Sequence, residues 1–425
     1  MKLLSTTAVA LIAVTAPAYA QYGSSYSGQP AQTAVPQQPK QSQQQAVPQQ
    51  AAQNSGPQPS NKARKAIVDL QTAVNANDVA NIPAKVAAAN AVASTKEDRY
   101  WISRLQLKAA VTANDLAGET AAIEGLASSG LVPTADMATF YGALGGTYYK
   151  AKQYDQAVAA FQKQSQLVPG DINPLEMIAE IRASQGRPAD AVTTLQQVIQ
   201  ASSATGKKPE EAVYRRAVAL SYEGKLPNTM DLVRQWVVAY PSGSSWHDAI
   251  AIYRNLHPGD SPNLIDVFRL ASATNALQEP ADYQIYATKT AEAANYGEAK
   301  AVVDAGIAAG KIKATDPTIA SVLTVSKGKI PTEAELAAAE KGAAVPTAYL
   351  RVGDRYYGAG NYAKAADLYR EALSKGTDAN LTNLRLGEAL ARSGDKAGAT
   401  TALNAVSGPL ADIAKLWLLY LQRQA

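Results

Sequence analysis

The stretch that decides the fold is ATFYGALGGTYYKAKQYDQAVAAFQKQSQLVPGD, residues 138–171. Apolar side chains recur along it at helical spacing. A very small residue lies midway along each of its two apolar runs, Gly145 in the first and Ala157 in the second. Because small side chains let two helix backbones approach closely, the stretch predicts a pair of packed helices joined by a turn.

The same pattern returns near the other end of the chain. Gly353 and Ala365 occupy the two small positions in the unit that starts at Pro346, and Gly387 and Ala399 occupy them in the next unit. Looser copies cover residues 172–205, 210–243 and 280–313. Bulky residues flank the small ones at matching offsets, in the first unit Tyr141, Leu144, Tyr148, Tyr154 and Phe161. A fixed internal period predicts an array of helical hairpins stacked on their neighbours.

These residues and their 34-residue spacing resemble the tetratricopeptide repeat. The resemblance implies an all-α fold, an α-α superhelical solenoid in which the first helix of each pair lines a concave groove. It also implies a protein that binds protein or peptide partners without catalysis. Together with the amino-terminal pattern described below, the chain looks like an exported bacterial member of this family. The expected divisions are a signal peptide 1–20, a linker 21–60, helical hairpins 61–137, repeats 138–243, degenerate helical repeats 244–345, two well-matched repeats 346–413 and a C-terminal capping helix 410–425.

The amino terminus has the pattern of a secretory signal peptide. Lys2 gives a basic start, an apolar run follows from Leu3 to Val14, and Ala18-Tyr19-Ala20 supplies small residues for a signal peptidase. Cleavage before Gln21 is predicted; the alternative is an uncleaved anchor. No later stretch is both apolar and long enough to span a bilayer, so we expect no stable membrane span and a periplasmic or extracellular location.

Residues 21–60 are rich in Gln and Pro, and Lys40 is their single charge. Such a composition buries too little apolar area to offset chain entropy, so it predicts a disordered tether. The alternative is that its proline-rich pieces bind a partner as polyproline helices.

Composition excludes several classes of function. The 425 residues contain no cysteine, which excludes disulfides, thiol nucleophiles and cysteine metal sites. They contain two histidines, His247 and His257. A net charge of +4 with 18% charged residues is too balanced for an electrostatic nucleic-acid binder. The basic pairs Lys207-Lys208 and Arg215-Arg216 fit a solvated face better than a lipid or polysaccharide site. No metal ligand set, cofactor or nucleic-acid partner is predicted.

Two short sequences match catalytic or cofactor-binding motifs, but the sequence around them does not fit those motifs. Residues 358–363, GAGNYA, satisfy a loose dinucleotide pattern, but no strand precedes them. Ser393 and Lys396 have the S-x-x-K spacing of acylating enzymes, but they fall at a repeat turn. We therefore predict no catalytic residue and no enzymatic activity.

What the pattern offers instead is a binding surface. The resemblance places a set of first-helix side chains in the groove, and its tyrosines combine apolar area with a hydroxyl group. Chaperone-binding members of the family hold a C-terminal carboxylate with Lys, Asn and Arg at groove positions. This sequence has Gly142, Gly146, Glu176 and Asp354 at those positions instead. The predicted groove residues are Tyr149, Lys150, Glu176, Glu180, Tyr214, Leu350, Asp354, Tyr357, Glu388 and Arg392.

Three functions follow as hypotheses. The first is an exported scaffold that binds protein or peptide partners in the cell envelope, within assembly, secretion or polysaccharide export. The second is a module that binds glycan or peptidoglycan through the groove tyrosines. The third is an enzyme of unfamiliar type within residues 244–345.

Overall fold

The computed structural model describes residues 57–204, 206–258 and 264–423. The predicted signal peptide lies outside these residues, as does nearly all of the predicted linker. All regular secondary structure in the described part of the chain is helical and no strand is present there, which confirms the predicted all-α class. The helices of its first half are α1 Asn61–Asn75, α2 Ile82–Val92, α3 Lys96–Ala113, α4 Leu116–Ser129, α5 Thr134–Lys150, α6 Tyr154–Leu167, α7 Asn173–Ser184, α8 Pro188–Ala204, α9 Glu211–Glu223 and α10 Thr229–Ala239.

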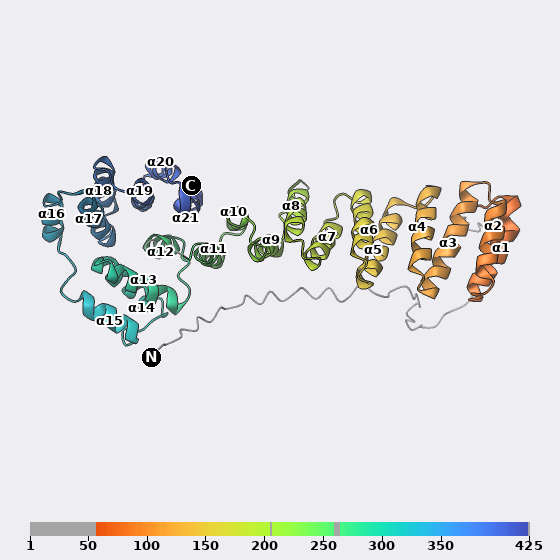
Figure 1. The fold of residues 1–425 in the computed structure, drawn as a ribbon, viewed down its shortest axis with the longest axis horizontal. Coiled ribbons are helices and arrows are strands. Elements are labelled where there is room, and N and C mark those ends of the chain that lie inside the picture. The colour runs from red at the N-terminus through yellow and green to blue at the C-terminus, as the bar shows by residue number, and fades with distance from the viewer. Residues whose placement is uncertain (1–56, 205, 259–263, 424–425) are drawn as a thin grey trace, which may run out of the picture. The chain divides into compact units, whose positions relative to one another are not determined.

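The second half continues in the same way (Figure 1). Its helices are α11 Gly243–Leu256, α12 Leu264–Ala273, α13 Pro280–Glu292, α14 Tyr296–Ala308, α15 Pro317–Ser326, α16 Glu333–Lys341, α17 Pro346–Gly358, α18 Tyr362–Ser374, α19 Ala379–Ser393, α20 Lys396–Asn404, the 3-10 helix η2 Gly408–Leu410 and α21 Ala411–Arg423.

Local sequence signals set where the helices begin and end. Thr95 opens α3 and Thr332 opens α16, each through a reciprocal hydrogen-bonded capping box with an acidic residue three positions later. Asn114 and Gly394 close α3 and α19 in the left-handed conformation that ends helices. The short polar turns therefore divide the chain into helical hairpins.

Each hairpin buries its apolar faces against its neighbours in sequence. Buried apolar residues form three consecutive clusters, one over α1–α3, one over α4–α7 and one from α7 to α21. The strongest packing joins the two helices of a pair, as in α5 with α6 and α17 with α18. This is the distribution of a repeat array, in which each unit is stabilised by the next.

The small positions of the repeat lie where the two helices of a hairpin come closest. Ala157, Ala365 and Ala399 are fully buried. The glycines Gly145, Gly353 and Gly387 face a large side chain one turn beyond those alanines, respectively Phe161, Tyr369 and Leu403. A Cβ atom on Gly387 would lie 2.5 Å from Leu403 Cγ, so the contact leaves no room for a side chain.

Contacts between distant segments appear in the C-terminal half. Helix α12 packs on α19, α14 packs on α17, and α10 packs on α21. Arg234 of α10 donates to Asp412 of α21 at 2.9 Å. Leu416 and Trp417 of α21 are fully buried, so the last helix covers the end of the apolar cluster.

Gly353 and Gly146 allow this packing to be tested with one kind of substitution. A Cβ on Gly353 would lie 2.7 Å from the ring of Tyr369, whereas one on Gly146 would meet no atom within 4 Å. Gly353→Ala is expected to destabilise the fold by about 1–3 kcal/mol through overpacking. Gly146→Ala is expected to stabilise it by about 0.5–1 kcal/mol, because alanine has the higher helix propensity. Denaturant unfolding followed by circular dichroism measures both, and equal effects of the two variants would contradict close packing at Gly353.

Candidate partner-binding faces

The predicted groove residues all lie on first helices of hairpins, but their surroundings differ between the two ends of the array. On α5, α7 and α9 they are Tyr149, Lys150, Glu176, Glu180 and Tyr214; on α17 and α19 they are Leu350, Asp354, Tyr357, Glu388 and Arg392. We call the first set the N-terminal face and the second the C-terminal face.

The C-terminal face is covered by the chain itself. Glu388 is fully buried and Tyr357 is 6% exposed, in contrast to the exposed groove side chains that the sequence predicts. The cause is α12, which packs on α19 (Figure 1). It presents Arg269 to both α17 and α19. Leu350 is half-buried, and Arg392 is exposed and donates to the hydroxyl of Tyr362 at 3.1 Å.

Arg269 is 1% exposed and makes contacts on every side. Its Nε and Nη2 donate to the two carboxylate oxygens of Glu298 on α14, each at 2.9 Å. Its Nη1 donates to Glu388 at 3.3 Å and to Asp266 at 3.4 Å. Its Cζ lies 4.0 Å from the centroid of the Tyr357 ring, the geometry of a cation–π contact.

A second buried arginine, Arg385 of α19, completes this ionic cluster. Its Nε donates to Asp266 at 2.9 Å and its Nη1 donates to Asp354 at 2.8 Å. Asp354 also accepts from the hydroxyl of Tyr369 at 2.8 Å and lies 3.5 Å from Arg269. Asp266 and Asp354 therefore each serve two guanidinium groups.

The cluster contains two guanidinium and four carboxyl groups, so with every group ionised it would carry two excess negative charges, and a proton on one carboxyl group reduces that excess. Burial, and then the neighbouring carboxylate of Asp266, raise the pKa of Glu388 well above its usual value. Burial is the largest effect on the pKa of Arg269 and lowers it, but the charge of Glu298, the hydrogen bonds to it and the further groups around the guanidinium together raise the pKa. Glu388 Oε1 has no hydrogen-bond partner, which costs less for a neutral carboxyl group than for an ionised one.

Sequence reasoning missed four members of the cluster: Asp266, Arg269, Glu298 and Arg385. Asp266 and Arg269 lie in a region that does not match the repeat. One signal could have found them, since α12 reads LIDVFRLASA and its two charged residues interrupt an otherwise apolar helix. Charged residues are rarely fully buried unless they are paired.

The N-terminal face is open by comparison. Tyr149 is half-buried with its ring centroid 6.0 Å from that of Tyr154, and Lys150 is exposed. Glu176 is half-buried, and the side chain of Glu180 is 45% exposed. Tyr214 is 8% exposed and packs edge-on against Tyr240, which removes it from the predicted binding surface.

Glu180 links two successive repeats. Arg216 of α9 donates from Nε and Nη2 to its two carboxylate oxygens, each at 2.8 Å. Glu176, one turn earlier, lacks such a partner among the described residues. Burial, then the charges of Glu210, Asp171 and Glu180, raise the pKa of Glu176.

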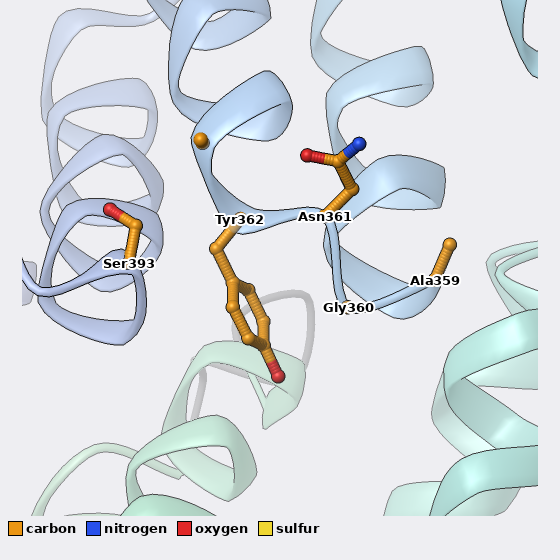
Figure 2. Close-up of a pocket in the computed structure, with 6 residues that line it drawn as sticks. Ala359, Gly360, Asn361, Tyr362 and Ser393 are labelled. Carbon is orange, nitrogen blue, oxygen red and sulfur yellow. The ribbon is translucent and has the colours of Figure 1, made fainter.

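The two weak catalytic motifs of the sequence meet in one surface hollow. Figure 2 shows Tyr362 at the start of α18 between the turn at Gly360 and Ser393 at the end of α19. Asn361 accepts from the backbone N–H of Lys364, and the Ser393 hydroxyl donates to the carbonyl of Leu390 at 3.1 Å. These side chains lie at helix ends of two successive repeats.

Neither histidine is part of a metal-ligand cluster in the part of the chain that the structure describes. His247 Nε2 lies 3.6 Å from Asp282 and its Nδ1 lies 3.5 Å from Asp248. Within residues 57–204, 206–258 and 264–423, no three His, Cys, Asp or Glu side chains are arranged to hold a metal ion.

Comparison with protein families identifies the repeats. Models of the tetratricopeptide repeat match residues 138–169 and 350–419. These two stretches therefore match the tetratricopeptide repeat, as the sequence predicts, and such repeats are typical of protein-interaction scaffolds. No curated relative matches the sequence.

Solved structures similar to this chain include three repeat-containing proteins. The TPR2AB domain of yeast Sti1 in complex with pHSP90 is 14% identical, covering 67% of this chain and 99% of its own, with a TM-score of 0.25. A tetratricopeptide repeat protein from Parabacteroides merdae is 13% identical, covering 69% and 99%, with a TM-score of 0.25. The pentatricopeptide repeat protein PPR10 from maize is 14% identical, covering 84% and 56%, with a TM-score of 0.28.

The raised pKa of Glu388 makes a pH-dependent prediction. The folded protein keeps a proton on Glu388 that the unfolded chain loses above its ordinary pKa, so this group's contribution to stability falls as pH rises from that value. Glu388→Gln is expected to remove the part of the pH dependence of the unfolding free energy that this proton causes, up to about 1.4 kcal/mol per pH unit. The variant is also expected to be at least as stable as the wild type at pH 8. Denaturant unfolding between pH 5 and 8 measures both.

Glu298→Gln is the matched control, since Glu298 holds Arg269 through two hydrogen bonds. It is expected to lose about 3–5 kcal/mol because a buried guanidinium loses its principal partner. An unchanged pH slope in Glu388→Gln, or a loss as large as that of Glu298→Gln, would contradict a neutral Glu388.

Proposed function

We propose that this protein is a noncatalytic scaffold that binds protein or peptide partners along the first-helix face of its repeats, at α5 and α7. One observation carries the proposal. The equivalent face at α17 and α19 holds a helical segment of polypeptide, α12, through an aromatic ring and carboxylates of those helices. The molecule itself therefore provides an example of this face binding a polypeptide.

The N-terminal face offers the same kinds of side chain without such a cover. Tyr149 and Glu180 are both partly accessible, and the carboxylate of Glu176 is half-buried. A ligand that enters this face can bury the tyrosine ring and pair with a carboxylate. These are the properties of a peptide-recognition surface.

We propose further that the scaffold works outside the cytoplasm, in the cell envelope, within an assembly, secretion or polysaccharide-export complex. The support is the signal-peptide pattern of residues 1–20 and the Gln- and Pro-rich stretch that follows it. In the described residues, no helix is long and apolar enough to cross a bilayer.

Glycan binding through groove tyrosines is the weaker alternative. It requires several accessible rings, and Tyr214 and Tyr357 are buried. Tyr149 is then the one partly accessible tyrosine among the five residues of the N-terminal face, whereas peptide binding can also use the carboxylates of Glu176 and Glu180.

Photo-crosslinking in intact cells tests the scaffold. A photoreactive residue at Tyr149 and another at Glu176 are expected to capture the same protein, and the product is expected in the extract released by osmotic shock. A photoreactive residue at Val238, 58% exposed on the second helix of a pair, is the control. Capture of the same protein from Val238, or of none from Tyr149 and Glu176, would contradict binding at this face. Crosslinked products that are confined to the cytoplasm would contradict the proposed export but not the proposed binding.

A further inference from the structure

The C-terminal face shows how two consecutive repeats of this chain hold one arginine. Arg269 stacks on the ring of Tyr357 at 4.0 Å and pairs with Glu388 at 3.3 Å. Tyr357 belongs to the first of the two repeats and Glu388 to the second. Their places are fixed by the small packing residues Gly353 and Gly387, since each lies at a set distance after one of them.

The same pair occurs at the N-terminal face in the same register. Tyr149 follows Gly145 by the spacing at which Tyr357 follows Gly353, and Glu180 follows Ala179 as Glu388 follows Gly387. The second aromatic residue is repeated as well. The Tyr149 and Tyr154 ring centroids are 6.0 Å apart, and those of Tyr357 and Tyr362 are 4.9 Å apart.

The N-terminal pair lacks an arginine on its ring. Within the described residues, no guanidinium or ammonium group stacks on Tyr149. Residues 1–56, 205, 259–263 and 424–425 contain no arginine either. An arginine at this position must therefore come from another molecule.

Glu180 already pairs with Arg216, but this does not fill its capacity. The side chain of Glu180 is 45% exposed, so its carboxylate can accept from a further donor. Asp354, at the same repeat position as Glu180, shows the double use: it pairs with Arg385 at 2.8 Å and lies 3.5 Å from Arg269.

The surrounding charge favours a cation on the α7 side. Glu176 lies one turn before Glu180, and its pKa is raised first by burial and then by Glu210, Asp171 and Glu180. Repulsion among these carboxylates is relieved by a positive ligand. Lys150, exposed at the end of α5 and next to Tyr149 in sequence, is the competing positive charge on the α5 side.

We propose that Tyr149 and Glu180 form an arginine-binding site for an arginine-bearing segment of a partner protein. The guanidinium stacks on the Tyr149 ring and shares the carboxylate of Glu180 with Arg216. Arginine fits better than lysine, because its planar group stacks on an aromatic face while its fork of N–H donors pairs with a carboxylate. This inference rests on the proposed function and names the partner's chemistry at the same face.

A peptide copied from α12 is the direct probe, since its sequence already occupies the equivalent site. A fluorescent peptide of residues 264–273 is titrated into the full chain, beside peptides in which Arg269 is replaced by Lys or by Gln. Binding is expected to weaken roughly tenfold with Gln and by less with Lys. Tyr149→Leu and Glu180→Gln of the full chain are expected to cause a similar loss for the arginine peptide, and Lys150→Ala no loss.

Circular dichroism checks that each variant of the full chain is folded. Tyr149→Leu leaves the pair of Glu180 with Arg216 in place, so it reports on the ring independently of Glu180→Gln. Absence of binding, equal binding of the three peptides, or arginine-peptide binding unchanged by Tyr149→Leu would overturn the inference. If Tyr149 captures a partner but peptide binding does not depend on arginine, the scaffold proposal stands and the arginine site is refuted. If peptide binding depends on arginine but no partner is captured, the arginine site stands and the scaffold proposal is refuted.

Discussion

A buried guanidinium group, that of Arg269, is the constraint on which the C-terminal half of this structure depends. An arginine cannot lose its proton in a protein, so its charge must be met inside the fold. Glu298, Asp266 and Glu388 meet it from three different helices, and Tyr357 covers its face. Helices α12, α14, α17 and α19 are therefore required to come together at one point.

This requirement gives two faces of one repeat pattern different roles. At α17 and α19 the first-helix face has become interior, and its carboxylates serve the fold. At α5 and α7 the related residues Tyr149 and Glu180 are still partly accessible. A binding surface and a structural contact are thus made from the same side chains, and what separates them is whether a helix of the chain covers the face.

Much of the fold could be predicted from the sequence because it is local and periodic. Gly145, Gly353 and Gly387 recur at set spacings, and each touches a large side chain on the second helix of its own hairpin. The burial of Glu388 could not be predicted in this way. It depends on α12, whose sequence does not follow the repeat and whose contact with α19 joins segments far apart in the chain. The repeat pattern thus places a residue on a face but does not tell whether that face is covered.

Amide hydrogen exchange of the wild type and of Arg269→Met, resolved along the chain by mass spectrometry, tests the central claim most directly. Exchange reports local opening, and Met replaces the stem of the arginine while removing its charge. Faster exchange in α12, α17 and α19, with wild-type rates in α3–α6, is the predicted result. Unchanged exchange in α12, or an equal increase along the whole chain, would contradict the role given to Arg269.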